Sequence, residues 1–551
     1  MLLLLYILIA VVSAESQPKQ TSIDQPSEKP LHSVAMDANG LPVWYDIRNL
    51  VGRNYASTVK NQNIPTYCDA SWALAAVSVI SDRFRLMYPS VWPVPEPAAQ
   101  VLINCDSRSY GCEGGSPLTA FRYIRENGIP DETCMPYTGI EERCRDVNIC
   151  RSCSEDGDCE AVYDYSVYSI SDYGSVSGEL NMQTEIYRRG PIACSLYTNS
   201  AFRYYHSGIF TNGDHGNDIH YVTLVGWGEE DGIPFWIARN SWGTSWGESG
   251  YIRLLRGRNL LGVESSCFWS FPALSRHSPN SPQNSPSFSS CGFPTDWSET
   301  PQVIKSPIPA SYVNISALPA IFDIRRIAGI DYSTPDHSQR SPQFCNACWA
   351  QATAAALSDR LQISRGKKWP TVEVSAQAIL NCAQGGCNGG DAGEAYRWVY
   401  SRGVGDKTCQ AYEGRKKTCD PLGRCMDCDG GGCWPVTVFR TVGVSEYGEV
   451  SGAEAMMAEI YERGPITCFM VMTEEFLRYE GGVFVEHDHN YKGGHIVEVT
   501  GWGVTSSGKR YWIVRNNLGE YWGEKGWFRI VMGGSNLLIE TSCSWGVPYL
   551  K

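Results

Sequence analysis

The pattern of apolar and polar residues predicts the same elements twice along the chain. A helical stretch closed by Gly-Pro, a helix stop, occupies residues 177–191 and recurs at 451–465. An apolar, strand-like run at 222–228 recurs at 497–503. The members of each pair are 274 or 275 residues apart, so the two halves of the sequence predict one fold repeated in tandem.

Short motifs extend this repeat over most of the sequence. A Gly-Cys-Xaa-Gly-Gly motif at 111–115 is matched at 386–390, and the offset stays between 274 and 277 residues throughout. The two copies are therefore nearly equal in length. We predict two domains, at 41–274 and 318–551.

The segments outside the two copies have a different character. Residues 2–12 form an apolar run that ends in small residues, which predicts a signal peptide at 1–14, followed by a short pro-segment at 15–40. A buried N-terminal strand is the alternative for this run. The linker and possible pro-segment at 275–317 is rich in Ser and Pro, and Asn314 lies there in a glycosylation sequon.

Composition narrows the class of protein. The 551 residues include 22 cysteines, which favours the secretory pathway and then the lysosome, endosome or extracellular space. A formal charge of −13 opposes binding to phosphate backbones, so we expect no nucleic acid partner. No segment has the apolar length of a membrane span, and a hydrophobic content of 43% predicts packed globular domains.

The cysteines sort into ten per copy plus two. Ten cysteines of the first copy recur in order in the second, which predicts five disulfides per domain. The run from Cys144 to Cys159 leaves zinc as an alternative, although no histidines cluster there. The two extra cysteines are Cys348, where the first copy has Ser71, and Cys291 in the linker. A supernumerary cysteine favours the hypothesis of a reactive thiol.

Cys348 has the sequence context of a nucleophile. It opens a stretch rich in helix formers, and a thiolate at a helix N-terminus is stabilised by the helix dipole. His495 precedes a predicted strand at 496–500, and Asn516 follows a second strand. The alternative is a buried thiol, a core histidine and a turn asparagine, but the order of the three groups favours catalysis.

These motifs resemble those of the papain family of cysteine peptidases. The resemblance rests on Cys-Asn-Ala-Cys-Trp at 345–349, Gly-Cys-Asn-Gly-Gly at 386–390, His495 and Arg515-Asn516. In each copy, a three-residue insertion before the first cysteine is similar to that of the cathepsin X (cathepsin Z) subfamily. The resemblance implies an α+β fold of two tandem, disulfide-rich domains, each with a helical lobe and a β-rich lobe.

The resemblance also implies a disulfide pairing, which spacing alone leaves open. It implies no cofactor and no metal ion. The implied pairs of the second copy, with equivalents in the first, are Cys345–Cys387, Cys382–Cys419, Cys409–Cys425, Cys428–Cys433 and Cys468–Cys543.

By the same resemblance, the second copy carries a complete catalytic set. Cys348 is the nucleophile and His495 the base, Asn516 orients the imidazole, and Gln339 donates a hydrogen bond to the oxyanion. Leu518 stands where the family has a tryptophan that shields the Asn–His hydrogen bond. We therefore expect weakened activity.

The first copy is expected to be degenerate. Gln62, His220 and Asn240 stand in place, but Ser71 replaces the nucleophile. A serine hydroxyl cannot form the resting ion pair, and the site lacks the carboxylate that serine peptidases place behind the histidine. We predict a pseudo-peptidase, with a working serine site as the alternative.

Two further residues refine the prediction. Arg340 occupies the position at which cathepsin X uses a histidine to recognise a C-terminal carboxylate, and an arginine can hold a carboxylate through two hydrogen bonds. This is a carboxypeptidase hypothesis, with a solvent-facing arginine as the alternative. Cys291 lies where the cathepsin X propeptide carries a cysteine that blocks the nucleophile, which favours a latent Cys291–Cys348 disulfide over an intermolecular one.

The sequence thus predicts a secreted or lysosomal cysteine-type peptidase, made as a zymogen, that acts on peptides or proteins. One domain is expected to be live and the other a pseudo-peptidase. The competing hypothesis is a noncatalytic secreted peptide-binding pseudo-enzyme. The sequence leaves the oligomeric state open.

Overall fold

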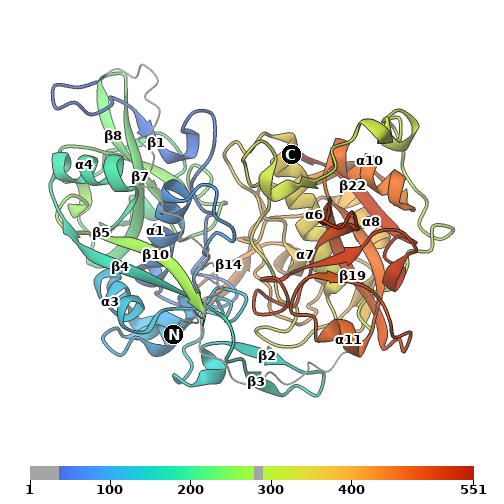
Figure 1. Ribbon diagram of the computed structural model, residues 1–551. Coiled ribbons are helices and arrows are strands. Elements are labelled where there is room, and N and C mark those ends of the chain that lie inside the picture. Colours follow the sequence, from blue (N-terminus) through green and yellow to red (C-terminus); the bar gives the residue numbers. More distant parts are fainter. Residues whose placement is uncertain (1–35, 278–289) are drawn as a thin grey trace, which may run out of the picture. The chain divides into compact units, whose positions relative to one another are not determined.

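The computed structural model describes residues 36–277 and 290–551 (Figure 1). The predicted signal peptide at 1–14, most of the pro-segment at 15–40 and linker residues 278–289 lie outside these ranges. Residues 34–551 form one compact unit. In the described ranges, no helix is long and apolar enough to cross a bilayer.

The first copy, blue to green in Figure 1, begins with a helical lobe and continues into a β-rich lobe. Its helices are α1 (Ser71–Met87), α2 (Ala99–Cys105), α3 (Pro117–Asn127), α4 (Glu179–Arg189) and α5 (Ser200–Arg203). Its strands are β1 (Tyr45–Asp46), β2 (Arg151–Cys153), β3 (Cys159–Ala161), β4 (Ser166–Val176), β5 (Ile192–Thr198), β6 (Ile209–Phe210), β7 (Asp218–Glu230), β8 (Ile233–Arg239), β9 (Tyr251–Leu255) and β10 (Cys267–His277).

The second copy, yellow to red in Figure 1, repeats this order. Its helices are α6 (Cys348–Ser364), α7 (Ala376–Cys382), α8 (Ala392–Arg402), α9 (Pro421–Arg424), α10 (Ala453–Arg463) and α11 (Glu474–Leu477). Its strands are β11 (Phe322–Asp323), β12 (Gly385–Gly386), β13 (Gly389–Gly390), β14 (Met426–Asp429), β15 (Gly432–Pro435), β16 (Val442–Val450), β17 (Ile466–Met472), β18 (Val483–Phe484), β19 (Gly493–Val504), β20 (Arg510–Arg515), β21 (Trp527–Val531) and β22 (Cys543–Leu550).

The large sheet of each β-rich lobe has the same strand order. In the first copy the order is β4-β10-β5-β7-β8-β9-β6, with β1 beside β7. In the second copy it is β16-β22-β17-β19-β20-β21-β18, with β11 beside β19. The helices predicted before each Gly-Pro pair are α4 and α10, and the predicted apolar strands lie within β7 and β19. The α+β fold in two tandem copies is therefore confirmed.

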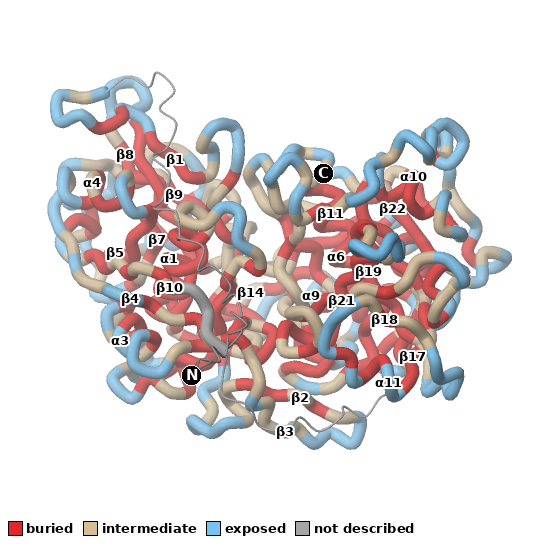
Figure 2. The backbone as a smooth tube through the Cα atoms, viewed as in Figure 1, coloured by how far each residue is buried: buried red, intermediate tan, exposed pale blue. Residues whose placement is uncertain are grey.

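One long helix runs through the core of each copy. Almost every residue of α1 and α6 is buried, and both are red along most of their length in Figure 2. A helix that is buried on all sides needs small or apolar residues on all sides, which explains the alanine-rich sequence of α6. These two helices begin at Ser71 and Cys348, so the core fixes the positions of both residues.

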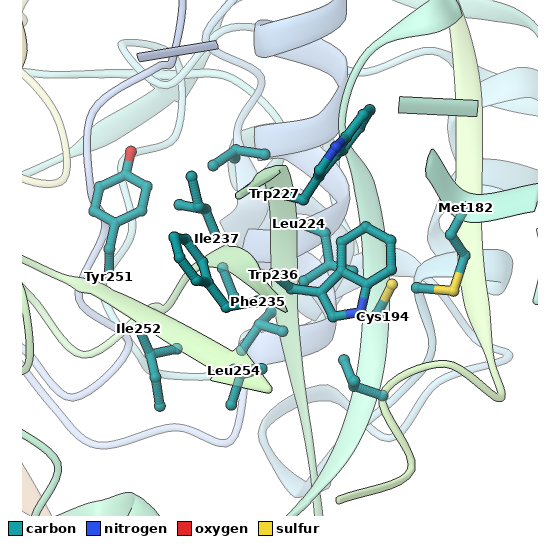
Figure 3. Packing of buried hydrophobic residues seen from close by; sticks show 14 of the residues in the cluster. Met182, Cys194, Leu224, Trp227, Phe235, Trp236, Ile237, Tyr251, Ile252 and Leu254 are labelled. Carbon is teal, nitrogen blue, oxygen red and sulfur yellow. The ribbon is translucent and has the colours of Figure 1, made fainter. Parts of the chain in front are cut away.

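In each copy, the β-rich lobe has its own hydrophobic cluster, separate from the one around the long helix. Figure 3 shows Trp227 of β7 and Trp236 of β8 packed with Leu224 and with Met182 of α4. All four side chains are buried, and each such side chain contributes about 2 kcal/mol on folding. The sheet that carries His220 is therefore closely packed against the core of its lobe.

The disulfides pair as the resemblance implied. All ten implied or equivalent bridges are present, and they include each cysteine of the run from Cys144 to Cys159, so the zinc alternative is wrong. The five bridges of the first copy are Cys68–Cys112, Cys105–Cys144, Cys134–Cys150, Cys153–Cys159 and Cys194–Cys267. Those of the second copy are Cys345–Cys387, Cys382–Cys419, Cys409–Cys425, Cys428–Cys433 and Cys468–Cys543.

Candidate active site

Cys348 lies at the N-terminus of the buried helix α6. The preceding Ala347 makes no side-chain capping hydrogen bond, so the first-turn backbone N–H groups and the helix dipole are left to stabilise negative charge. The Cys348 side chain is fully buried. The helix predicted from this cysteine is confirmed and extends to Ser364.

His495 lies on β19, and Asn516 immediately follows the neighbouring strand β20. The imidazole Nε2 lies 2.8 Å from Asn516 Oδ1, which also accepts a hydrogen bond from the Asn517 N–H at 2.9 Å. Because Oδ1 can only accept, Nε2 carries the proton and Nδ1 is the basic nitrogen. The predicted strand boundary at 496–500 is wrong, since β19 already begins at Gly493 and includes the histidine.

Cys348 is bonded to Cys291, which confirms the predicted intrachain disulfide. The Cys291 sulfur also lies 3.0 Å from His495 Nδ1. The Cys291 N–H donates to the Gly494 carbonyl at 3.0 Å, and its carbonyl accepts from the Gly390 N–H at 3.3 Å. The linker therefore covers both the nucleophile and the basic nitrogen of the histidine.

Two glycines allow the linker to pass this close to β19. A Cβ atom on Gly292 would lie 2.8 Å from the backbone carbonyl carbon of His495. A Cβ atom on Gly494 would lie 2.2 Å from the Gly292 carbonyl oxygen. Neither space can hold a side chain, so the blocked geometry depends on both glycines.

Beyond the disulfide, the linker lies against the second copy. Val303 exchanges backbone hydrogen bonds of 3.0 and 2.9 Å with Tyr447 on β16. The neighbouring Glu446 carboxylate accepts hydrogen bonds from the N–H groups of Lys305 and Ser306 at 2.8 and 2.9 Å. The linker is thus held by the same copy to which Cys291 is disulfide-bonded.

Gln339 lies on the loop before α6, beside the segment that follows Asn516. Its N–H donates to the Asn517 carbonyl at 2.9 Å. Its side-chain amide is buried, and neither amide atom has a hydrogen-bond partner within 36–277 and 290–551. A buried amide without a partner is costly for folding, and it is the kind of group that can donate to a developing oxyanion.

Burial dominates the electrostatics of the histidine. The pKa of His495 is lowered to about 4, chiefly by burial and also by the positive charge of Arg340, while the hydrogen bond to Asn516 acts in the opposite direction. Arg340 is itself buried, with Nη1 3.5 Å from the Cys153 carbonyl oxygen and the guanidinium over the Phe344 ring. The alternative of a solvent-facing Arg340 is therefore wrong.

The residue two positions after the asparagine differs between the copies. In the first copy, the ring of Trp242 packs on His220, with centroids 4.8 Å apart. In the second copy the equivalent residue is Leu518, which is buried. An aliphatic side chain thus replaces the indole that packs on the histidine, while the bond between His495 and Asn516 is kept.

The first copy brings together its own histidine and asparagine, with His220 Nε2 2.6 Å from Asn240 Oδ1. The pKa of His220 is also lowered to about 4, mainly by burial. Ser71 Oγ accepts a hydrogen bond from the Tyr221 N–H at 3.2 Å. Its hydroxyl is therefore engaged with the backbone of the strand that carries the histidine.

The glutamine of the first copy is also engaged. Gln62 Nε2 donates to the Cys68 carbonyl at 3.3 Å, and Gln62 Oε1 accepts from the Ser241 hydroxyl at 2.7 Å. In the second copy Asn517 replaces this serine and donates instead to the Ile496 carbonyl at 3.0 Å. The two copies thus differ in whether the side-chain amide of this glutamine has hydrogen-bond partners among the described residues.

Sequence reasoning missed a cluster of buried charges behind the second site. Arg515 lies 2.7 Å from Asp359, 3.3 Å from Asp336 and 3.2 Å from Glu498. Burial raises the pKa of all three carboxyl groups, to about 7 for Asp336, although the charge of Arg515 opposes the shift. Three carboxyl groups therefore share one guanidinium.

A comparison of the two copies could have revealed this cluster. The first copy has Val59 and Thr223 at the positions of Asp336 and Glu498, and only the pair of the arginine with the helix aspartate is repeated. Acidic residues gained at two positions of one copy were the available signal. The fold adds that these residues, which are far apart in the sequence, meet at Arg515.

Comparisons with known proteins agree with this geometry. The family profile described as "Papain family cysteine protease" matches residues 41–271 and 318–547. "Cathepsin Z" of Onchocerca volvulus is 39% identical over 241 residues, which are 42% of this chain and 78% of that protein. "Cathepsin B-like cysteine proteinase 6" of Caenorhabditis elegans is 32% identical over 233 residues, or 38% of this chain and 61% of that one.

A solved structure is also similar. The bromelain protease from Ananas comosus, in complex with the E64 inhibitor, is 28% identical and has a TM-score of 0.35. The match covers 42% of this chain and 99% of the bromelain chain.

The buried acid cluster makes stability depend on pH. A carboxyl group whose pKa is raised in the folded state contributes its full stabilisation of the fold below its unfolded-state pKa, which is 3.8 for Asp336. This contribution is lost as the pH rises through the folded-state pKa of about 7. We expect Glu498→Gln to lose less stability than wild type between about pH 5 and pH 8. Urea unfolding at both pH values measures this, with Thr223→Val of the first copy as control. Equal losses in Glu498→Gln and wild type would refute the assignment.

Proposed function

Because the chain belongs to the papain family of cysteine proteases, we propose that its second copy is a latent thiol peptidase that uses Cys348, His495 and Asn516. The observation that carries this proposal is the convergence of the three groups. Cys348 begins a buried helix. Its sulfur, the sulfur of Cys291 and a ring nitrogen of His495 lie within 4.8 Å of one another. Asn516 holds the imidazole ring through a hydrogen bond.

The first step is release of the nucleophile. A thiol reductant supplies two electrons, splits the disulfide, and leaves Cys291 and Cys348 as free thiols. Cys348 then passes its proton to His495 Nδ1, 3.0 Å from the sulfur of Cys291 in the blocked state. The thiolate restores a negative partner to the imidazole, which opposes the effect of burial and favours the ion pair.

Peptide hydrolysis follows from this ion pair. The thiolate attacks the scissile carbonyl carbon, and the Cys348 N–H and the Gln339 amide donate to the oxyanion. His495 gives its proton to the leaving amine, which departs and leaves an acyl-enzyme. Water, deprotonated by the imidazole, then hydrolyses the thioester and regenerates Cys348. Asn516 keeps Nε2 protonated throughout, so that Nδ1 always faces the reaction.

We propose that the first copy is a pseudo-peptidase that does not hydrolyse peptides. Ser71, held by the Tyr221 N–H, has no thiolate to offer, and the Gln62 amide is already hydrogen-bonded. These contacts support the prediction of a pseudo-peptidase.

Arg340 would give the live site its preference for peptide ends. Its positive charge lowers the pKa of His495. Arg340 itself lies on the insertion loop, directly after Gln339. A substrate carboxylate paired with Arg340 would place the last peptide bond near Cys348, as a carboxypeptidase requires. In the blocked state the guanidinium is instead held against Cys153 and Phe344.

The compartment follows from the same reasoning. Ten structural disulfides support an oxidising route through the secretory pathway to the lysosome or the extracellular space. The zymogen state would be the Cys291–Cys348 disulfide. Asn314 is exposed enough to carry a glycan, since its side chain bonds only within its own turn in the part of the chain described.

Release of the disulfide should activate the protein. We expect the unreduced wild type to hydrolyse no peptide and to resist iodoacetamide at Cys348, because its sulfur is bonded. Cys291→Ser should be labelled at Cys348 and hydrolyse peptides without reductant. Peptide mapping and a peptide-release assay measure both. Labelling of Cys348 without hydrolysis would favour the noncatalytic peptide-binding alternative.

Activity should belong to the second copy alone. In the Cys291→Ser background, we expect Cys348→Ser to lower kcat/KM about a thousandfold or more. The matched variant Ser71→Ala removes the equivalent side-chain oxygen of the first copy and should leave kcat/KM unchanged. A large loss in Ser71→Ala would show that the first site is a working serine peptidase.

Recognition of a free C-terminus should depend on Arg340. In the same background, Arg340→Ala should lower kcat/KM about tenfold for a peptide acid, because one charge-assisted contact is lost. Cleavage of the corresponding peptide amide should change much less, because Arg340→Ala then removes only the effect of the Arg340 charge on His495. Asn63→Ala, at the equivalent position of the first copy, is the control. An equal effect on acid and amide would contradict a carboxypeptidase role.

A further inference from the structure

The contacts between the two copies come in equivalent pairs. Arg48 of the first copy lies over Trp369 of the second, 4.7 Å from the ring centroid. Arg325, the equivalent arginine, lies over Trp92 of the first copy at 4.3 Å. Each copy therefore presents the same surface to the other, as in a two-fold interface.

One pair of contacts lies on the loops that follow Asn516 and Asn240. The Glu520 N–H of the second copy donates to Thr133 Oγ1 of the first at 2.9 Å. The equivalent Thr244 N–H of the first copy donates to Thr408 Oγ1 of the second at 3.0 Å. All four residues are buried or partly buried. Each copy thus holds the loop that follows the asparagine of the other.

The loop held by Thr133 carries two parts of the live site. It begins at Asn516, whose side chain orients the imidazole, and its Asn517 carbonyl accepts the Gln339 N–H. Glu520, where the loop is anchored, is the fourth residue after Asn516, the partner of the imidazole. A second contact from the first copy, the Tyr168 hydroxyl, donates to Glu520 Oε2 at 3.0 Å.

Close packing leaves this loop little freedom. Gly519 has a φ of +93°, and a Cβ atom there would lie 3.1 Å from Thr133 Oγ1. In the first copy, a Cβ atom on Gly243 would likewise lie 3.2 Å from Thr408 Oγ1. The threonine of one copy therefore touches both the glycine and the N–H that follows it in the other copy.

We propose that Thr133 of the first copy is a positioning residue for the catalytic site of the second. It fixes the loop 516–520, and through this loop it sets the orientation of the His495–Asn516 pair and of the Gln339 backbone. The degenerate copy therefore acts as a built-in subunit of the live one. This inference rests on the proposed peptidase function of the second copy.

The reciprocal contacts supply a matched control. Thr133→Val and Thr408→Val each remove one hydroxyl, keep the side-chain shape and disrupt the equivalent hydrogen bond from the loop N–H of the other copy. Thr408→Val also removes a contact of 3.2 Å between the Thr408 and Thr244 hydroxyls. In both variants the backbone N–H still donates to the aspartate two residues earlier, at 2.8 Å from Thr133 and 2.9 Å from Thr408. Only Thr133 stands behind the site that has a thiol nucleophile.

The experiment uses the full chain with Cys291→Ser. We expect Thr133→Val to lower kcat about fivefold with little change in KM, because a hydrogen bond behind the cleft is lost. It should also displace the pH dependence of Cys348 alkylation by iodoacetamide. Thr133→Ser should restore both quantities. Thr408→Val should change neither, although thermal unfolding should show it to be destabilised at least as much as Thr133→Val, because its hydroxyl makes one more contact between the copies.

The readouts separate this inference from the proposed function. Equal effects of the two valine variants on kcat and alkylation, no effect of either, or no restoration by Thr133→Ser would overturn it. If the Cys291→Ser protein hydrolyses no peptide, the peptidase proposal fails while the alkylation profiles still decide the inference. A profile displaced in Thr133→Val alone then supports positioning, and identical profiles reject it.

Discussion

A buried ion pair joins the two lobes of each copy, and the geometry of both sites depends on it. In the second copy Asp359 of α6 lies 2.7 Å from Arg515 at the end of β20. Asp359 is about three helical turns from Cys348, and Arg515 immediately precedes Asn516. Asp82 and Arg239 repeat the pair at 2.6 Å in the first copy. In the first copy, loss of one partner would leave a buried charge uncompensated, at a cost of about 3–5 kcal/mol.

This frame explains why the first copy keeps its architecture without its nucleophile. The helix, the histidine strand and the asparagine are held by the ion pair and the two hydrophobic clusters, none of which involves the residue at position 71. The substitution at Ser71 and the hydrogen bonds of Gln62 are local changes within an intact frame. The second copy departs differently, since Leu518 and the extra acids near Arg515 alter the surroundings of His495 and Asn516.

Much of the fold was predictable because the duplication repeats each signal. The Gly-Pro helix stops, the apolar strands and the ordered cysteines appear twice, and a resemblance to a known family supplied the disulfide pairing. The position of Cys348 at a helix N-terminus and of His495 beside Asn516 follows from the same repeated elements. The contacts that tune them were not: the burial of Arg340, the sharing of Arg515 by three carboxyl groups and the anchoring of Glu520 by Thr133 join residues far apart in sequence. Such contacts have no local periodicity to reveal them.

The linker that blocks Cys348 belongs to the same polypeptide as the site. After reduction, Cys291 stays tethered to the domain through the residues up to Leu318, so reformation of the bond is a unimolecular event at a high effective concentration. The open fraction is then set by the ratio of reduced to oxidised thiols in the surroundings and not by the amount of protein. While the tether is intact, the chain behaves as a reversible sensor of its redox environment.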